Sequence, residues 1–137
     1  MGLDLNAAMD AIGVRLGTIT GLRVADYAAQ SINVPQAIVS LPTAPVEYDA
    51  VMGRGADRAV IPVRVLVGAV SDRASRDAVA AYVSGTGASS VKSAVEGNDP
   101  TMGGAVQTVR VMTATVDIVT VGAVDYLGAS FEVEVFD

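Results

Sequence analysis

Helical periodicity appears at the start of the chain and again in its middle. Over residues 5–16 one stripe is apolar, and Asp4 is placed to cap the first turn. The stripe consists of Leu5, Ala8, Met9, Ile12 and Leu16. A second helix is expected over residues 72–84, behind the potential cap Ser71, and a short third helix over residues 90–96. Glycines follow each of these segments and predict their ends.

Strand-like patterns occupy most of the remaining chain. The clearest alternation covers residues 59–70, although Pro62 there predicts an edge position or a bulge. Two long segments, residues 104–121 and 124–136, form the second half, and a phase slip near residues 112–115 predicts a bulge in the first of them. Shorter segments complete the set: residues 22–27 and 37–41 as strands, and residues 46–51 as a strand or one arm of a long hairpin.

The order of these elements predicts a single α+β domain spanning residues 1–137. We expect an antiparallel or mixed sheet of four to five strands, with two main helices packed on one face, plus a long hairpin or loop. In the last expected strand, residues 124–136, the alternation of residue types predicts which side is buried. Its apolar residues point to one side, and the carboxylates Glu132 and Glu134 point to the other.

Composition adds an argument about assembly. Apolar residues make up 51% of the chain and charged residues only 18%, compared with about 25% charged in ordinary soluble domains. Two interpretations stay open: part of the apolar surface is covered by other subunits, or the genome favours codons for small apolar residues. The uncharged stretch 27–46 contains Pro35, Pro42 and Pro45, so it is no membrane-spanning helix.

Charge is distributed unevenly along the chain. The net charge is −6, which is unlike the basic footprint of a nucleic-acid-binding protein. Residues 1–80 carry eight acids and seven bases, whereas residues 81–137 carry seven acids and only two bases, Lys92 and Arg110. An acidic second half could therefore meet a more basic first half in a neighbouring copy.

Catalytic chemistry is poorly supported by the residue types present. The chain contains no His and no Cys, which excludes Ser-His-Asp and Cys-His arrangements and thiolate metal sites. Glycine-rich turns at residues 53–55 and 85–87 lack the spacing of phosphate-binding loops. Lys92, among serines, is best interpreted as a solvated residue on a short helix. We therefore expect no enzyme and no cofactor or metal.

The candidate functional residues are charged positions suited to contacts between subunits. Arg54, Asp57 and Arg58 form a cluster before the strand over residues 59–70, and Arg64 lies within that strand. Arginine suits planar ion pairs at interfaces. Glu132 and Glu134 are the complementary candidates for an acidic face, either in a subunit interface or lining a lumen. A solvated hairpin tip and a solvated strand face are the alternative interpretations.

The sequence also resembles a known family. The resemblance covers nearly the whole chain and rests on these segments: Leu5-Asn6-Ala7-Ala8-Met9-Asp10-Ala11-Ile12, Pro35-Gln36-Ala37-Ile38-Val39-Ser40-Leu41-Pro42, Tyr48-Asp49, Gly53-Arg54-Gly55-Ala56-Asp57-Arg58, Pro62-Val63-Arg64-Val65-Leu66-Val67, Ser71-Asp72-Arg73-Ala74-Ser75-Arg76-Asp77 and Val124-Asp125-Tyr126-Leu127-Gly128-Ala129. In these segments the chain resembles the tail terminator (tail completion) proteins of phages with long, non-contractile tails, particularly those that infect actinobacteria.

The resemblance implies a structural role in the virion. A tail terminator of this kind forms a hexameric ring at the head-proximal end of the tail tube. The protein itself is made in the host cytoplasm and becomes part of the virion. Its implied partners are further copies of itself, the major tail tube protein, and the head-tail connector or stopper protein. DNA would pass through the lumen without specific binding. Another head-tail connector, a tail tube subunit, and an acidic binding module that mimics nucleic acid are the alternatives.

Overall fold

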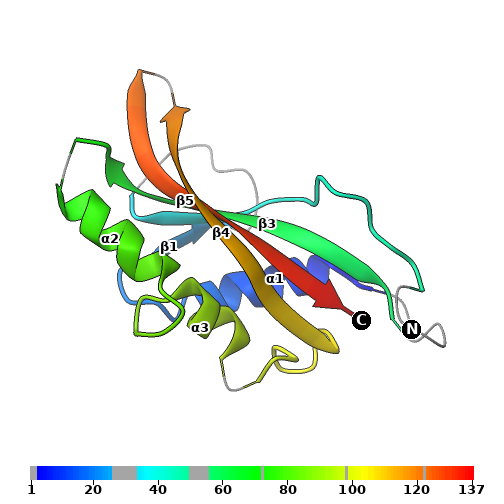
Figure 1. Ribbon diagram of the computed structural model, residues 1–137. Coiled ribbons are helices and arrows are strands. Elements are labelled where there is room, and N and C mark those ends of the chain that lie inside the picture. Colours follow the sequence, from blue (N-terminus) through cyan, green and yellow to red (C-terminus); the bar gives the residue numbers. More distant parts are fainter. Residues whose placement is uncertain (1–2, 26–33, 50–55, 72, 98, 122) are drawn as a thin grey trace.

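The structure is a computed structural model, which describes residues 3–25, 34–49, 56–71, 73–97, 99–121 and 123–137. It is an α+β fold with a five-stranded mixed sheet (Figure 1). In chain order the elements are α1 (Leu5–Leu16), β1 (Arg23–Ala25), β2 (Gln36–Val39), β3 (Arg58–Ala69), α2 (Arg73–Val83), α3 (Val91–Glu96), β4 (Thr108–Val121) and β5 (Val124–Phe136). The expected fold class is therefore confirmed.

The sheet has the strand order β1-β2-β3-β5-β4. β1 and β2 are parallel, and every other neighbouring pair is antiparallel. β4 and β5 form a long hairpin whose far end projects beyond the rest of the sheet (Figure 1). The two outer strands are consequently very unequal, because β1 has three residues and β4 has fourteen.

One face of the sheet packs against the helices and carries the core. β3 contributes Ile61, Val63 and Val65 to it, and β5 contributes Phe131 and Val133, all almost completely buried. Apolar side chains of the three helices close the cluster: Ala8, Met9, Ile12 and Leu16 from α1, Val79 and Tyr82 from α2, and Val91 and Val95 from α3. The alternating residues point to the opposite face, which we call the open face.

The cap that the sequence predicts for the first helix is confirmed. The third helix, expected from residue 90, begins at Val91 with Ser90 as its N-cap. The residue before α2 lies outside the described residues, so the expected cap Ser71 stays a prediction. The carboxylate of Asp4 accepts a hydrogen bond from the backbone N–H of Ala7, and the hydroxyl of Ser90 accepts one from Ser93 at the start of α3. Each interaction satisfies an N–H that the first helical turn leaves without an intrahelical partner. The predicted bulge is also confirmed, because the register between β4 and β5 shifts between Val111 and Thr113.

The expectation that Pro62 marks an edge position or an early bulge is wrong for β3. This strand lies between β2 and β5, and its register with β5 is continuous from Arg58 to Leu66, with a shift only between Leu66 and Gly68. The proline is tolerated because its backbone N and O point toward β2 and away from β5. Its carbonyl oxygen accepts a hydrogen bond from Ser40, just past the end of β2. In an antiparallel strand the N and O of one residue point to the same side. The absent N–H of Pro62 therefore faces the place where β2 ends, and the ladder with β5 loses no bond.

The segment 46–51 was expected to be a strand or a hairpin arm. Among its described residues, only Glu47 makes a β-bridge, opposite Arg58. The backbone groups of these two residues bond reciprocally, at N to O distances of 2.8 and 2.7 Å. Residues 50 and 51 lie outside the described part of the chain, as does Gly122 between β4 and β5.

Candidate functional site

Four of the six candidate residues lie on the open face of the sheet. Arg58 and Arg64 come from β3, and Glu132 and Glu134 from β5, all in the register that alternates with the core positions. Asp57 directly precedes β3. Arg54 lies outside the described residues, so its predicted place beside Asp57 and Arg58 stays a prediction.

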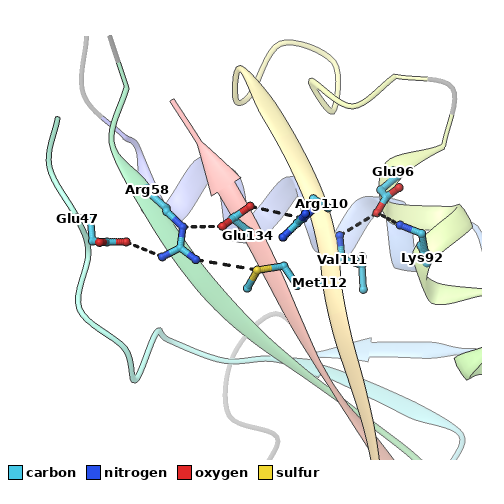
Figure 2. A network of polar contacts seen from close by, with 8 residues as sticks. All are labelled: Glu47, Arg58, Lys92, Glu96, Arg110, Val111, Met112 and Glu134. Atoms are coloured by element: carbon cyan, nitrogen blue, oxygen red, sulfur yellow. Dashed lines mark hydrogen bonds and ion pairs between the residues drawn. The ribbon is translucent and has the colours of Figure 1, made fainter. Parts of the chain in front are cut away.

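Arg58 is the centre of a polar network across three strands (Figure 2). Its Nε donates to Glu134 Oε2 at 2.6 Å, and its Nη1 donates to Glu47 Oε2 at 2.5 Å. Glu134 also faces Arg110 of β4, with Nε and Oε1 3.6 Å apart. The guanidinium therefore ties the β2–β3 connection to the edge of the sheet through Glu134.

Burial makes the pair with Glu134 the strongest contact in this network. The Glu134 side chain is 12% exposed and that of Arg58 26%. Hydrogen bonding to Glu134, followed by that to Glu47, raises the pKa of Arg58 above its ordinary value. Because the Arg58–Glu134 pair forms within one chain, the two groups that the sequence analysis assigned to facing subunits are already engaged with each other.

Asp57 organises the chain around it. One carboxylate oxygen accepts from the N–H of Leu3 at 3.3 Å, and the other accepts from the N–H of Asp49 at 3.1 Å. The backbone groups of Asp57 and Asp137 bond reciprocally at the C-terminal end of β5. These contacts give Asp57 a structural role where three segments meet.

Arg64 and Glu132 are exposed and line a shallow groove on the open face. The groove has a volume of about 370 Å³ and is also lined by Ile38 and Pro62. Arg64 stands in register with Ser130, and Glu132 with Pro62. The open face therefore presents a basic and an acidic side chain side by side, so it is mixed in charge at this point.

An exposed apolar arm, not expected from the sequence, projects from the sheet. The far half of the β4–β5 hairpin, residues 113–121 and 124–127, carries Val116, Ile118 and Val124 with exposed fractions of 50%, 58% and 45%. We call this half the hairpin arm. The signal available in the sequence was a run of β-branched residues interrupted by a single charge, Asp117. Strand periodicity alone could not show that no helix covers them.

A second missed residue is Glu96, at the end of α3. Its Oε2 accepts from Lys92 Nζ at 2.5 Å and from the backbone N–H of Val111 at 2.9 Å (Figure 2). The second contact fastens α3 to β4 immediately before the bulge. The carboxylate thus supplies the partner that a further strand would otherwise give to this N–H.

Asp99 is the anchor of the turn that leads into β4. Its carboxylate accepts from the hydroxyl and the N–H of Thr101 and from the N–H of Gly103. These contacts lower the pKa of Asp99 below its ordinary value, and the hydrogen bond from the Thr101 side chain is the largest cause. Arg15, whose Nη2 lies 3.6 Å from Asp99 Oδ2, makes a smaller contribution in the same direction.

Neither metal-binding geometry nor a membrane-spanning helix occurs in the described part of the chain. There, no three His, Cys, Asp or Glu side chains gather as metal ligands would. No described helix is long and apolar enough to cross a membrane. Comparison of the sequence with protein-family models gives no match, and comparison with curated proteins gives none either.

Proposed function

We propose that this protein is a structural subunit of a phage virion. It forms a ring that caps the head-proximal end of the tail tube, stops polymerisation of the tube and joins the tail to the head connector. The proposal rests on the sequence resemblance to tail terminator proteins together with one structural observation. That observation is the hairpin arm, in which Val116, Ile118 and Val124 are about half exposed.

Exposed apolar side chains grouped on one projecting element are typical of a surface that another protein covers. In a ring, each subunit presents one patch to a different patch on its neighbour. A sheet with two unlike ends suits such contacts, because β1 and β4 differ in length and in charge. Partners at the two faces of the ring would be the tail tube protein and the head-tail connector.

Native mass and electron microscopy of the purified protein test this function. We expect a discrete closed ring of a single size, with a mass of six copies. Long tubes would instead identify a tail tube subunit. A monomer or dimer that binds a basic partner would identify an acidic mimic of nucleic acid.

A second experiment tests the basic cluster. The double variant Arg54→Ala/Arg58→Ala should weaken ring formation or attachment to tail tubes. The double variant Arg73→Ala/Arg76→Ala, at two exposed positions of α2 outside the candidate residues, is a matched control for the loss of two cations. If the double variant folds, forms rings and caps tubes as the parent does, these two arginines have no role in assembly.

A further inference from the structure

The outer strand β4 is protected along only part of its length. Before the bulge in β4, the carboxylate of Glu96 accepts a hydrogen bond from the backbone N–H of Val111. Beyond it, every side chain from Thr113 to Ile118 is exposed. Natural edge strands are usually blunted by lysine, proline or short length, because unpaired N–H and C=O groups recruit other strands. Residues 113–121 contain neither lysine nor proline, and their one charge is Asp117, so this edge is suited to pairing with a strand that offers a cation opposite it.

The register shows what each face of this edge presents. Val116 is paired with Ala129 and Ile118 with Leu127, which places both on the face that carries the helices. Asp117 is paired with Gly128, whose partner on β3 is Leu66, and so lies on the open face. The edge of β4 is therefore apolar on the helix face and negative on the open face.

The outer strand at the other end of the sheet is complementary. Val24 of β1 is in register with the core residue Ala37 and lies on the helix face. Arg23 is in register with Gln36, is exposed, and lies on the open face. Beside Val24 is a shallow recess of about 290 Å³, lined also by Asp10, Gly13 and Val14. This end is therefore positive on the open face, and on the helix face it presents Val24 beside a recess whose lining includes the carboxylate of Asp10.

We propose that β4 of one copy pairs with β1 of a second copy and extends the sheet from subunit to subunit. The strand directions allow it, because β4 runs antiparallel to β1 within the sheet. With Asp117 opposite Arg23, Val116 stands opposite Val24, beside the recess, and Thr115 opposite Ala25. Each side chain then meets a partner on its own face.

Charge favours this head-to-tail contact over a contact between two copies of β4. In the register that places Asp117 opposite itself, two β4 edges would bring two carboxylates together, and residues 111–137 contain no cation that could pair with Asp117 in any other register. A contact between different patches can repeat until a ring closes. The inference thus rests on the proposed function for the need to assemble, and it names the surfaces that meet.

A pair of engineered cysteines tests the register directly, since the natural chain has none. Residues opposite each other in an antiparallel pair lie about 4.5–5.5 Å apart at Cα, within the range of a disulfide. The variant Thr115→Cys/Ala25→Cys should give a ladder of covalent multimers on a non-reducing gel after mild oxidation. The control Thr108→Cys/Ala25→Cys, with its first cysteine seven residues earlier on β4, should give none.

A charge exchange supplies the second arm of the experiment. Asp117→Arg and Arg23→Asp should each raise the dissociation constant of the assembly by about tenfold, and the double variant should restore most of the affinity. Circular dichroism verifies that each variant folds. Three results would each overturn the inference. The double-cysteine variant could form oligomers that give no covalent ladder, the single variant Thr115→Cys could give covalent dimers, or the unsubstituted protein could stay monomeric.

The same data separate this inference from the proposed function. If the cysteine variant forms the ladder and the double charge variant regains affinity, but the protein does not cap tail tubes, the proposed interface is supported and the role in the tail is rejected. Rings that cap tubes but do not cross-link at these positions would keep the tail role and reject the interface.

Discussion

Glu96 of α3 accepts a hydrogen bond from the backbone N–H of Val111 in β4, across 2.9 Å. The contact joins a six-residue helix to the outer strand at the point where the register shifts. It also separates two parts of the same edge. Before the bulge the strand is covered by α3, and beyond it the hairpin arm is exposed.

Replacing Glu96 with Ala should lower the free energy of unfolding by about 1–3 kcal/mol, because the partly buried N–H of Val111 loses a charged acceptor. Urea denaturation measures the change. Glu96→Gln keeps an acceptor and should cost less. Lys92→Ala removes only the i,i+4 ion pair and should cost about 0.5 kcal/mol or less. Equal losses in Glu96→Ala and Lys92→Ala would show that the contact with Val111 contributes nothing.

The long elements and their faces were predictable from local patterns. Alternation placed residues 124–136 in a strand with Phe131 inward and Glu132 outward, and the structure has both. A phase slip was enough to locate the bulge. Such features follow from side-chain direction along a single strand.

What could not be predicted depends on neighbours distant in the chain. Pro62 lies in a central strand because β2 ends beside it, which no local signal reveals. Arg58 and Glu134 are 76 residues apart, so their pairing required the order of the strands. Similarly, the exposure of Val116 depends on how far α3 reaches along β4.

Replacement of Arg58 should lower the free energy of unfolding, because it removes the main partner of the Glu134 carboxylate. Arg58→Ala should destabilise the fold by about 1–3 kcal/mol, because Glu134 is largely buried and keeps only the longer contact with Arg110. Thermal or urea unfolding measures this loss. Arg110→Ala is the matched control and should have a smaller effect, since its side chain is 63% exposed. The reverse order of the two losses would reassign the main partner of Glu134.

Gly128 should tolerate no side chain. A Cβ at this position would stand 2.7 Å from the carbonyl oxygen of Val65, between paired strands that cannot separate without losing their ladder. Gly128→Ala should therefore destabilise the protein by about 1–3 kcal/mol. Gly85→Ala has no atom within 4 Å of its new Cβ and should be close to neutral in the same unfolding assay. A neutral Gly128→Ala would contradict this close approach.

Asp99 predicts an acid dependence of stability. Its pKa is lowered in the folded state, chiefly by the hydroxyl of Thr101, so its contribution is complete above the ordinary aspartate pKa of 3.8. The contribution is lost as the pH falls below that value and through the folded pKa. The stability difference between the parent and Asp99→Asn should accordingly shrink as the pH is lowered from 7. An NMR titration of the Asp99 carboxyl should give a midpoint below 3.8, and a midpoint above it would contradict the hydrogen bonding described.

Ile118 separates stability from assembly. Because its side chain is 58% exposed in one copy, Ile118→Lys should change the free energy of unfolding of the single subunit by less than about 1 kcal/mol. The same change places a charge beside the apolar contact with β1, so it should weaken self-association measured by light scattering. Tyr48→Lys, in the connection between β2 and β3, is a control with an even more exposed side chain. Equal self-association of the two variants would remove the hairpin arm from the interface, whereas selective loss in Ile118→Lys would place it there.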